Sequence, residues 1–251
     1  MADASRPLRK HLEELRWRLM IVVIAVVIGA GVSVVYFKPI VEILIRPAEG
    51  YLSATGGPIY TEVTELLGVT VKVAMLGGLV LSLPILTYQI VAFVAPGLTR
   101  KEKGYLIFMV PGALACFAIG AAFAYFVLLP PMLKFLLTYA NDVAVPMIRI
   151  STYINLVVML IFWMGLIFET PLIMFTAAKA GVLSADTMAK GRRIIVVVAF
   201  MLGAVITPTF DPVNQTMVAI PFLVLYEIGL RLARFARPRE EPEEATDGAS
   251  S

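Results

Sequence analysis

Two features of one apolar stretch, FWMGLIFETPLIMF at positions 162–175, suggest chemistry: a carboxylate at Glu169 and a proline at Pro171. A charged side chain within a membrane helix is costly, so it should face a bundle interior or a water-filled cavity. Pro171 removes the helical hydrogen bond to the carbonyl of Ile167, which favours a kink beside the acid. The pair therefore predicts a concave, hydrated indentation.

Two roles for Glu169 remain open. It pairs with a polar group such as Gln89 or Tyr88 and only fixes the packing of helices, or it lines an intramembrane groove together with Gln89. In the second case the groove accepts an apolar peptide segment or a polar group of a partner helix.

Catalytic and metal-binding residue sets are missing from this sequence. It has one histidine, His11, and one cysteine, Cys116. Neither an intramembrane Ser–His dyad nor the H-E-x-x-H or P-loop pattern occurs. We therefore expect no enzymatic activity, no cofactor and no metal, and we expect Cys116 to be a small packing residue.

The composition indicates a polytopic membrane protein, because 59% of the 251 residues are hydrophobic and only 16% are charged. The apolar runs are too long for barrel strands and lack alternation, so they are predicted to be helices. Six spans are expected, at residues 19–37, 67–94, 105–129, 153–178, 194–207 and 216–235. The fifth is short, about 21 Å against a hydrocarbon core of about 30 Å, and the sixth has a short apolar part. The predicted fold is an all-α, cupped bundle.

Positive charge predicts the orientation of the bundle. Basic clusters precede the first span and follow the second, fourth and sixth spans. Six spans place all four clusters on one side, so the positive-inside rule puts both termini in the cytoplasm. The expected organisation is a cytoplasmic amphipathic N-terminus (1–18), a transmembrane domain (19–235) and a disordered cytoplasmic tail (236–251). The larger outer loops, 38–66 and 130–152, are long enough to form a structured cap.

Two acids lie among these inner basic residues. Glu14 belongs to an amphipathic segment, where Glu14 and Arg18 have the i,i+4 spacing of a helical ion pair. Glu14 is then either a surface residue in a salt bridge or a residue that binds a cation. Glu102 is either a helix N-terminal acid favoured by the helix dipole or an acidic spot that receives a basic ligand.

Four stretches, in order, resemble the signatures of the TatC family, the core subunit of the twin-arginine protein translocase. They are HLEELRWRL (11–19), LPILTYQIVAFVAPGLTRKEK (83–103), LIFETPL (166–172) and TPTFDPVNQTMVAIPFLVLYEIG (207–229). The likeness extends over residues 8–236. In the first outer loop, where the family commonly has a Pro-x-Glu-x-Phe-like pattern, this chain reads TEVTELL (61–67), with leucine in place of the aromatic residue.

The resemblance implies a Sec-independent translocase subunit that binds twin-arginine signal peptides at the cytoplasmic face. It would nucleate a complex that exports folded proteins, driven by the proton motive force. Arginine pairs with carboxylates in a bidentate geometry that lysine cannot match. The positions that match the family's signal-peptide contacts are Glu14, Leu15, Arg16, Phe93, Pro96 and Glu102.

The resemblance also implies partners. Single-span subunits like TatA and TatB would dock at the short pair 194–235, where Asp211 and Gln215 lie in the outer turn and Met201 offers an adaptable contact. Asp211 is expected to cap the last helix as well. A homo-oligomer within a larger complex of a bacterial or archaeal inner membrane is expected, without nucleic acid.

Two alternatives to a signal-peptide receptor remain. One is a small proton- or ion-coupled secondary transporter that uses Glu169 as its carrier site. The lack of an internal repeat and the presence of a single buried acid speak against it. The other is a purely structural scaffold, which would bind partners but no peptide.

Overall fold

The structure is a computed structural model that describes residues 5–52, 58–94, 100–138, 147–179, 181, 183–207 and 211–236. Side chains are not described for residues 5–12, 51–52, 91, 93–94 and 100–108. The tail expected to be disordered lies outside these ranges, apart from Ala236.

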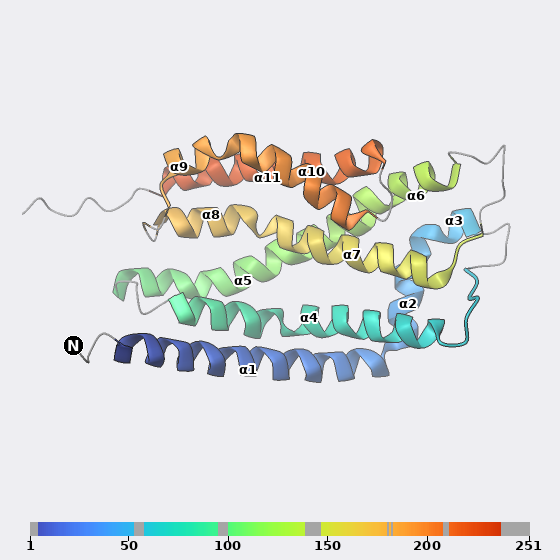
Figure 1. The fold of residues 1–251 in the computed structure, drawn as a ribbon, viewed down its shortest axis with the longest axis horizontal. Helices are drawn as coiled ribbons and strands as arrows, with labels where there is room; N and C mark the ends of the chain where they lie inside the picture. Colours follow the sequence, from blue (N-terminus) through green and yellow to red (C-terminus); the bar gives the residue numbers. More distant parts are fainter. Residues whose placement is uncertain are drawn as a thin grey trace, which may run out of the picture.

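Long helices run side by side along one axis of the molecule (Figure 1). They are α1 (Ser5–Val35), α4 (Glu65–Val94), α5 (Arg100–Phe123), α7 (Ile150–Phe168), α8 (Thr170–Lys179), α10 (Arg192–Ile206) and α11 (Pro212–Phe235). Shorter helices are α2 (Phe37–Ile45), the 3-10 turn Arg46–Ala48, α3 (Glu49–Leu52), α6 (Leu129–Thr138) and α9 (Ala185–Lys190). The predicted all-α fold is confirmed.

The long helices alternate in direction, with α7 and α8 running the same way as one interrupted helix, so that the start of α1 and the end of α11 lie at the same end of the bundle (Figure 1). We call this end the terminal end. Within the described part of the chain, five helical stretches are long and apolar enough to cross a membrane: Glu13–Val35, Glu65–Ile90, Met109–Thr138, Ile150–Lys179 and Pro212–Phe235. The remaining helix, α10, has 15 residues and is about 22 Å long at about 1.5 Å per residue. A sixth crossing therefore stays a prediction.

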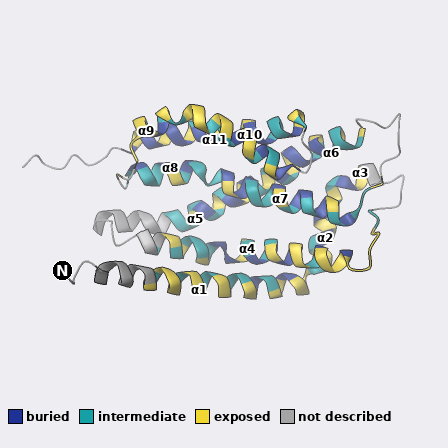
Figure 2. Cartoon of the chain, in the orientation of Figure 1, coloured by how far each residue is buried: buried dark blue, intermediate teal, exposed yellow. Residues whose placement is uncertain are grey.

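The first helix is continuous across the boundary expected at residues 18 and 19, so the predicted amphipathic segment belongs to the same helix as the first span. It packs closely on α4. A Cβ atom added to Gly78 would lie 2.6 Å from the carbonyl oxygen of Val26, and one at Gly77 would overlap the Ser33 hydroxyl. Small residues at such contacts allow helix backbones to approach closely. Most described side chains on the other face of α1 are exposed (Figure 2).

The expected end of the third span at Pro130-Pro131 is wrong. The helix passes from α5 through a five-residue π-helical turn, Ala124–Leu128, into α6. Both prolines therefore stand in the first turn of α6, where a missing N–H costs little because the π-turn has already shifted the hydrogen-bond register. The proline pair marks this change of register, not the start of a loop.

Helix α7 forms the centre of the core. Its side chains Ile154, Val157, Leu160 and Met164 are almost fully buried, and they are part of the main buried cluster, which Leu129 and Met132 of α6 also join. The contact with α5 depends on two glycines. A Cβ atom added to Gly120 would lie 2.5 Å from the Met164 carbonyl oxygen, and one at Gly165 would overlap the ring of Phe117. This interface sets the position of Glu169, which directly follows α7.

The end of the bundle opposite the terminal end is closed by α2, α3, α6 and the segment around Ile59 (Figure 1). We call this part the cap. Ile59 forms a parallel bridge with Arg149, in which its N–H donates to Ile148 O at 3.0 Å and its carbonyl accepts from Ile150 N at 2.9 Å. The hydroxyl of Tyr153 donates to Leu44 O at 2.7 Å. The predicted structured cap is thus confirmed in its described parts, with residues 53–57 and 139–146 outside them.

Candidate functional site

Three polar residues join α1 to α4 near the terminal end. The Nε and Nη2 atoms of Arg18 both donate to Oε1 of Glu14, at 3.0 and 2.6 Å. The Nη1 atom of Arg18 donates to Gln89 Oε1 at 3.1 Å. The predicted i,i+4 pair is therefore confirmed, and its arginine is held from α4. The Glu14 side chain stays 38% exposed, and within the described part of the chain its Oε2 accepts no hydrogen bond.

The other residues expected to contact a signal peptide are only partly placed. Leu15 and Arg16 are exposed on α1. Phe93 lies at the end of α4 and Glu102 in the first turn of α5, but their side chains are not described. Pro96 lies outside the described residues. Their predicted role stays a prediction.

Gln89 was grouped with Glu169 by sequence reasoning, but the structure brings it to Arg18. Gln89 lies in the last turns of α4. Glu169 lies between α7 and α8, and α8 continues from there to Lys179. No hydrogen bond joins the two among the described residues. Gln89 therefore contacts the Glu14–Arg18 pair, and its place in a groove with Glu169 stays a prediction.

The helix is interrupted at Glu169, as predicted from Pro171. Helix α7 ends at Phe168 and α8 begins at Thr170. The N–H of Glu169 donates to Leu166 O at 3.1 Å, and the helical pattern resumes when Ile173 N donates to Glu169 O at 2.9 Å. Pro171 occupies the first turn of α8, where no donor is needed.

The carboxylate of Glu169 is half-buried. Cys116 of α5 lies near it, but among the described residues it accepts no hydrogen bond. The pairing with Gln89 or Tyr88 is therefore not seen, and Tyr88 is 60% exposed. The acid thus keeps its acceptor capacity at a break in a central helix.

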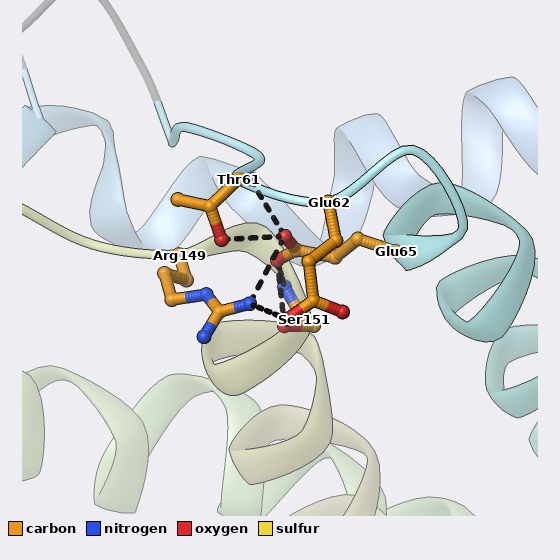
Figure 3. A network of polar contacts seen from close by, with 5 residues as sticks. All are labelled: Thr61, Glu62, Glu65, Arg149 and Ser151. Atoms are coloured by element: carbon orange, nitrogen blue, oxygen red, sulfur yellow. Dashed lines mark hydrogen bonds and ion pairs between the residues drawn. The ribbon is translucent and has the colours of Figure 1, made fainter.

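The densest polar network lies in the cap (Figure 3). Oε1 of Glu65 accepts from the backbone N–H and the hydroxyl of Ser151, at 3.0 and 2.6 Å. Oε2 accepts from Thr61 N at 2.8 Å and lies 3.5 Å from Arg149 Nη2. Arg149 also donates to Glu62 at 3.1 Å, and this bond raises the pKa of the guanidinium, because Glu62 favours its charged form. Ser151 lies in the first turn of α7, so Glu65 caps that helix from another helix.

Sequence reasoning counted Glu65 only as one acid of the first outer loop. Two signals could have found the network. The family pattern at residues 61–67 has a glutamate at this place, and Arg149 is a positive charge on the side that the positive-inside rule disfavours. An arginine there needs an acidic partner, and the acids of the first outer loop were among the candidates on that side.

The turn before α11 contains the predicted N-cap residue of that helix. Oδ1 of Asp211 accepts from Asn214 N at 2.7 Å, and Oδ2 accepts from Asn214 Nδ2 at 2.9 Å. The expected N-cap is confirmed. Gln215 lies at a close contact between α10 and α11, because a Cβ atom on Gly203 would lie 2.8 Å from the Gln215 carbonyl oxygen. Met201 is 63% exposed on α10.

We expect Asp211→Ala to lower the free energy of unfolding by about 1 kcal/mol, because the first turn of α11 loses its cap. Asp211→Asn should lose less, since an amide oxygen still accepts from Asn214 N. Denaturant unfolding in detergent measures both. Asp186→Ala, an exposed first-turn acid of α9 that is not the N-cap, should stay within about 0.5 kcal/mol of the wild type. Equal losses for the Ala and Asn variants of Asp211 would contradict the cap as the cause.

Fold and site together define an all-helical, multi-pass membrane protein that carries acidic acceptors at one end and at a central helix break. The particular family follows from comparison with known proteins. The family model described as Sec-independent protein translocase protein (TatC) matches residues 10–221, and the chain belongs to this family.

Relatives and a solved structure agree with this assignment. The Sec-independent protein translocase protein TatC of Carboxydothermus hydrogenoformans is 34% identical over 96% of this chain and 98% of its own. The TatC of Aquifex aeolicus is 37% identical over 95% of this chain and 100% of its own. A crystal structure described as the twin arginine translocase receptor TatC superposes with a TM-score of 0.81 at 36% identity, covering 90% of this chain and 99% of that chain.

The resemblance recognised from the sequence is thus confirmed. As a TatC-family member the chain is a component of the twin-arginine translocase and not an enzyme. The family favours protein translocation over the small-solute transporter considered above.

Proposed function

We propose that this chain binds twin-arginine signal peptides at the cytoplasmic face and nucleates an assembly that exports folded proteins, driven by the proton motive force. The similar crystal structure, described as a twin arginine translocase receptor, supports a receptor role. In this proposal the chain crosses an inner membrane six times, α10 included, and the terminal end faces the cytoplasm.

The arrangement of Glu14 carries the proposal. Arg18 takes only Oε1 of the carboxylate and is itself tied to Gln89. Oε2 therefore stays available to a further donor, on a side chain that is 38% exposed, while Arg18 holds the carboxylate in place. A guanidinium of the peptide would donate to Oε2 and add a second cation to a pre-oriented acceptor. Charge-assisted hydrogen bonds of this kind are about twice as strong as neutral ones.

A second arginine requires a second acceptor, and Glu102 supplies it in this proposal. It stands in the first turn of α5, and the end of α4 and the start of α5 lie at the terminal end, as does the start of α1 (Figure 1). Exposed Leu15 would contact apolar parts of the peptide near the arginines. Phe93 and Pro96 complete the surface by their positions in the family signature.

Deeper contacts involve Glu169 and the last two helices. The carboxylate of Glu169, without a described hydrogen bond, would accept a polar group from the peptide's apolar helix or from a partner helix. Single-span TatA- and TatB-like subunits would dock at α10 and α11, beside Met201 and Gln215. The short α10 favours a partner there, because a helix of about 22 Å does not fill the bilayer alone.

The test is peptide binding to the purified full chain in nanodiscs. An Arg-Arg signal peptide should bind at least tenfold more tightly than its Lys-Lys twin, which corresponds to about 1.4 kcal/mol. We expect Glu102→Ala and Glu14→Gln each to reduce this preference to less than about threefold, because the loss of a charged acceptor for the guanidinium weakens the Arg-Arg peptide more than the Lys-Lys peptide.

Glu13→Gln is the matched control. It removes the neighbouring, exposed acid of the same helix and should preserve the preference. A wild type that binds both peptides equally would contradict the proposal, and so would a Glu13→Gln variant that loses as much as Glu14→Gln.

A further inference from the structure

An open apolar groove of 310 Å³ lies between α8, α9, α10 and α11 at the terminal end. Its lining includes Ile173, Ala177, Met188, Gly191, Ile195 and Tyr226. The groove is separate from the Glu14 cluster, which lies between α1 and α4, and from Asp211 at the other end of α11.

The polar side chains of the lining are already engaged. The hydroxyl of Tyr226 donates to Met188 O at 2.5 Å. The Thr187 hydroxyl shares a hydrogen bond with Ser184 at 2.8 Å. The surface of the groove therefore offers hydrocarbon contacts, and its occupant should be a hydrocarbon chain.

The depth of the groove suits the upper part of an acyl chain. Ala177 and Ile173 lie about 3 and 9 Å along α8 from Lys179, its last residue. In the orientation proposed above, Lys179 marks the level of the inner headgroups. The groove then lies directly beneath those headgroups.

Basic residues flank the mouth of the groove at Gly191. Arg192 is paired with Glu227, through contacts of 2.7 and 2.8 Å. Lys190 and Arg193 are exposed, and no ion pair with a described residue is recorded for either. Asp186 is an exposed acid of the same segment. Outside the Arg192–Glu227 pair, Lys190 and Arg193 carry two positive charges and Asp186 carries one negative charge. The net positive charge at the mouth of the groove therefore favours an anionic group.

We propose that this groove binds one anionic glycerophospholipid of the inner leaflet. One acyl chain lies against Ile173, Ala177 and Ile195, and the phosphate contacts Lys190 and Arg193. The volume is that of a small-molecule site, whereas a polypeptide helix of about 10–12 Å diameter needs a longer trough. The bound headgroup would also lie close to the start of α10. There it would compensate for the hydrophobic mismatch between this short helix and the bilayer.

The experiment measures lipid binding to the purified, delipidated full chain by native mass spectrometry. Dioleoyl phosphatidylglycerol is compared with dioleoyl phosphatidylcholine, which has the same chains, and with glycerol 3-phosphate, which has none. We expect phosphatidylglycerol to bind at least fivefold more tightly than phosphatidylcholine, and glycerol 3-phosphate not to bind measurably.

Variants separate the headgroup from the chain. The double variant Lys190→Gln with Arg193→Gln should reduce phosphatidylglycerol affinity to the phosphatidylcholine level. Ala177→Trp should weaken both lipids, because it fills the groove. The control pair Arg231→Gln with Arg234→Gln removes the same charge from exposed positions of α11 and should bind like the wild type. Equal wild-type affinity for the two lipids, or equal loss in both double variants, would overturn the proposal.

Photolabelling of the wild type covers the case in which Ala177→Trp fails to fold. Phosphatidylglycerol with a diazirine in its acyl chain should label residues 173–177 and 194–195. Labels confined to other faces would overturn the proposal. Loss of these labels on addition of a synthetic single-span helix, with no competition from unlabelled phosphatidylglycerol, would assign the groove to a protein partner instead.

Discussion

Glu65→Gln is expected to lower the melting temperature of the protein by about 5–10 °C, because it breaks several hydrogen bonds at once. The Glu65 side chain is only 2% exposed. It accepts from Ser151 through one oxygen and from Thr61 through the other. Glutamine has nearly the same shape but presents an NH2 group where one of these donors points. A buried donor then loses its acceptor, and Arg149 loses an anion.

Thermal unfolding of the full chain in detergent measures this effect. Glu62→Gln is the matched control, because its carboxylate contacts the same arginine but is 67% exposed. Exposed ion pairs contribute little, so the control should melt within about 2 °C of the wild type. Equal shifts for both variants would show that the charge of Arg149, and not the capping of α7, governs the stability of the cap.

Gly120→Ala is expected to destabilise the protein by about 2–3 kcal/mol through overpacking. The added methyl group would lie 2.5 Å from the carbonyl oxygen of Met164. A backbone atom cannot move aside as a flexible side chain does, so α5 and α7 must separate. The adjacent contact between the tilted rings of Phe123 and Phe168, whose centroids are 5.4 Å apart, should loosen as well. Glu169 follows Phe168 directly, so its position should shift.

Gly112→Ala is the control on the same helix. Its nearest neighbour outside the helix would be Leu172, at 3.8 Å, which is an ordinary contact. Alanine is the better helix former by about 1 kcal/mol, so this variant should be neutral or slightly stabilised. Chemical unfolding in mixed detergent compares the two. Similar stabilities for both variants would mean that the α5–α7 contact tolerates separation.

Local patterns explain which site features could be predicted from the sequence. The Glu14–Arg18 pair needs only helical i,i+4 spacing, and the Asp211 cap needs only a polar residue before a helix. The break at Glu169 follows from Pro171 within the same segment. Each of these features involves residues a few positions apart, so helix geometry alone determines which groups come into contact.

Contacts between residues far apart in the chain could not be predicted from the sequence. Glu65 and Ser151 are 86 positions apart, and Arg18 and Gln89 are 71 apart. Either partner could have met several other polar groups. The hydrogen bond between Arg18 and Gln89 was missed for this reason, because Gln89 is a polar residue in an apolar helix and the sequence does not state its depth.

The sequence by itself determined the class of protein, the family and the local features of each helix. The length of each apolar run and the distribution of charge around it indicate whether a segment lies in the membrane or in water. Short-range motifs indicate where its helix begins and ends. Only the tertiary structure decided that Glu65 caps α7, that Gln89 holds Arg18, and that α9 and α10 leave an apolar groove against α8 and α11. These contacts depend on how closely helices approach and how they are rotated, which glycines such as Gly78 and Gly120 set through backbone distances.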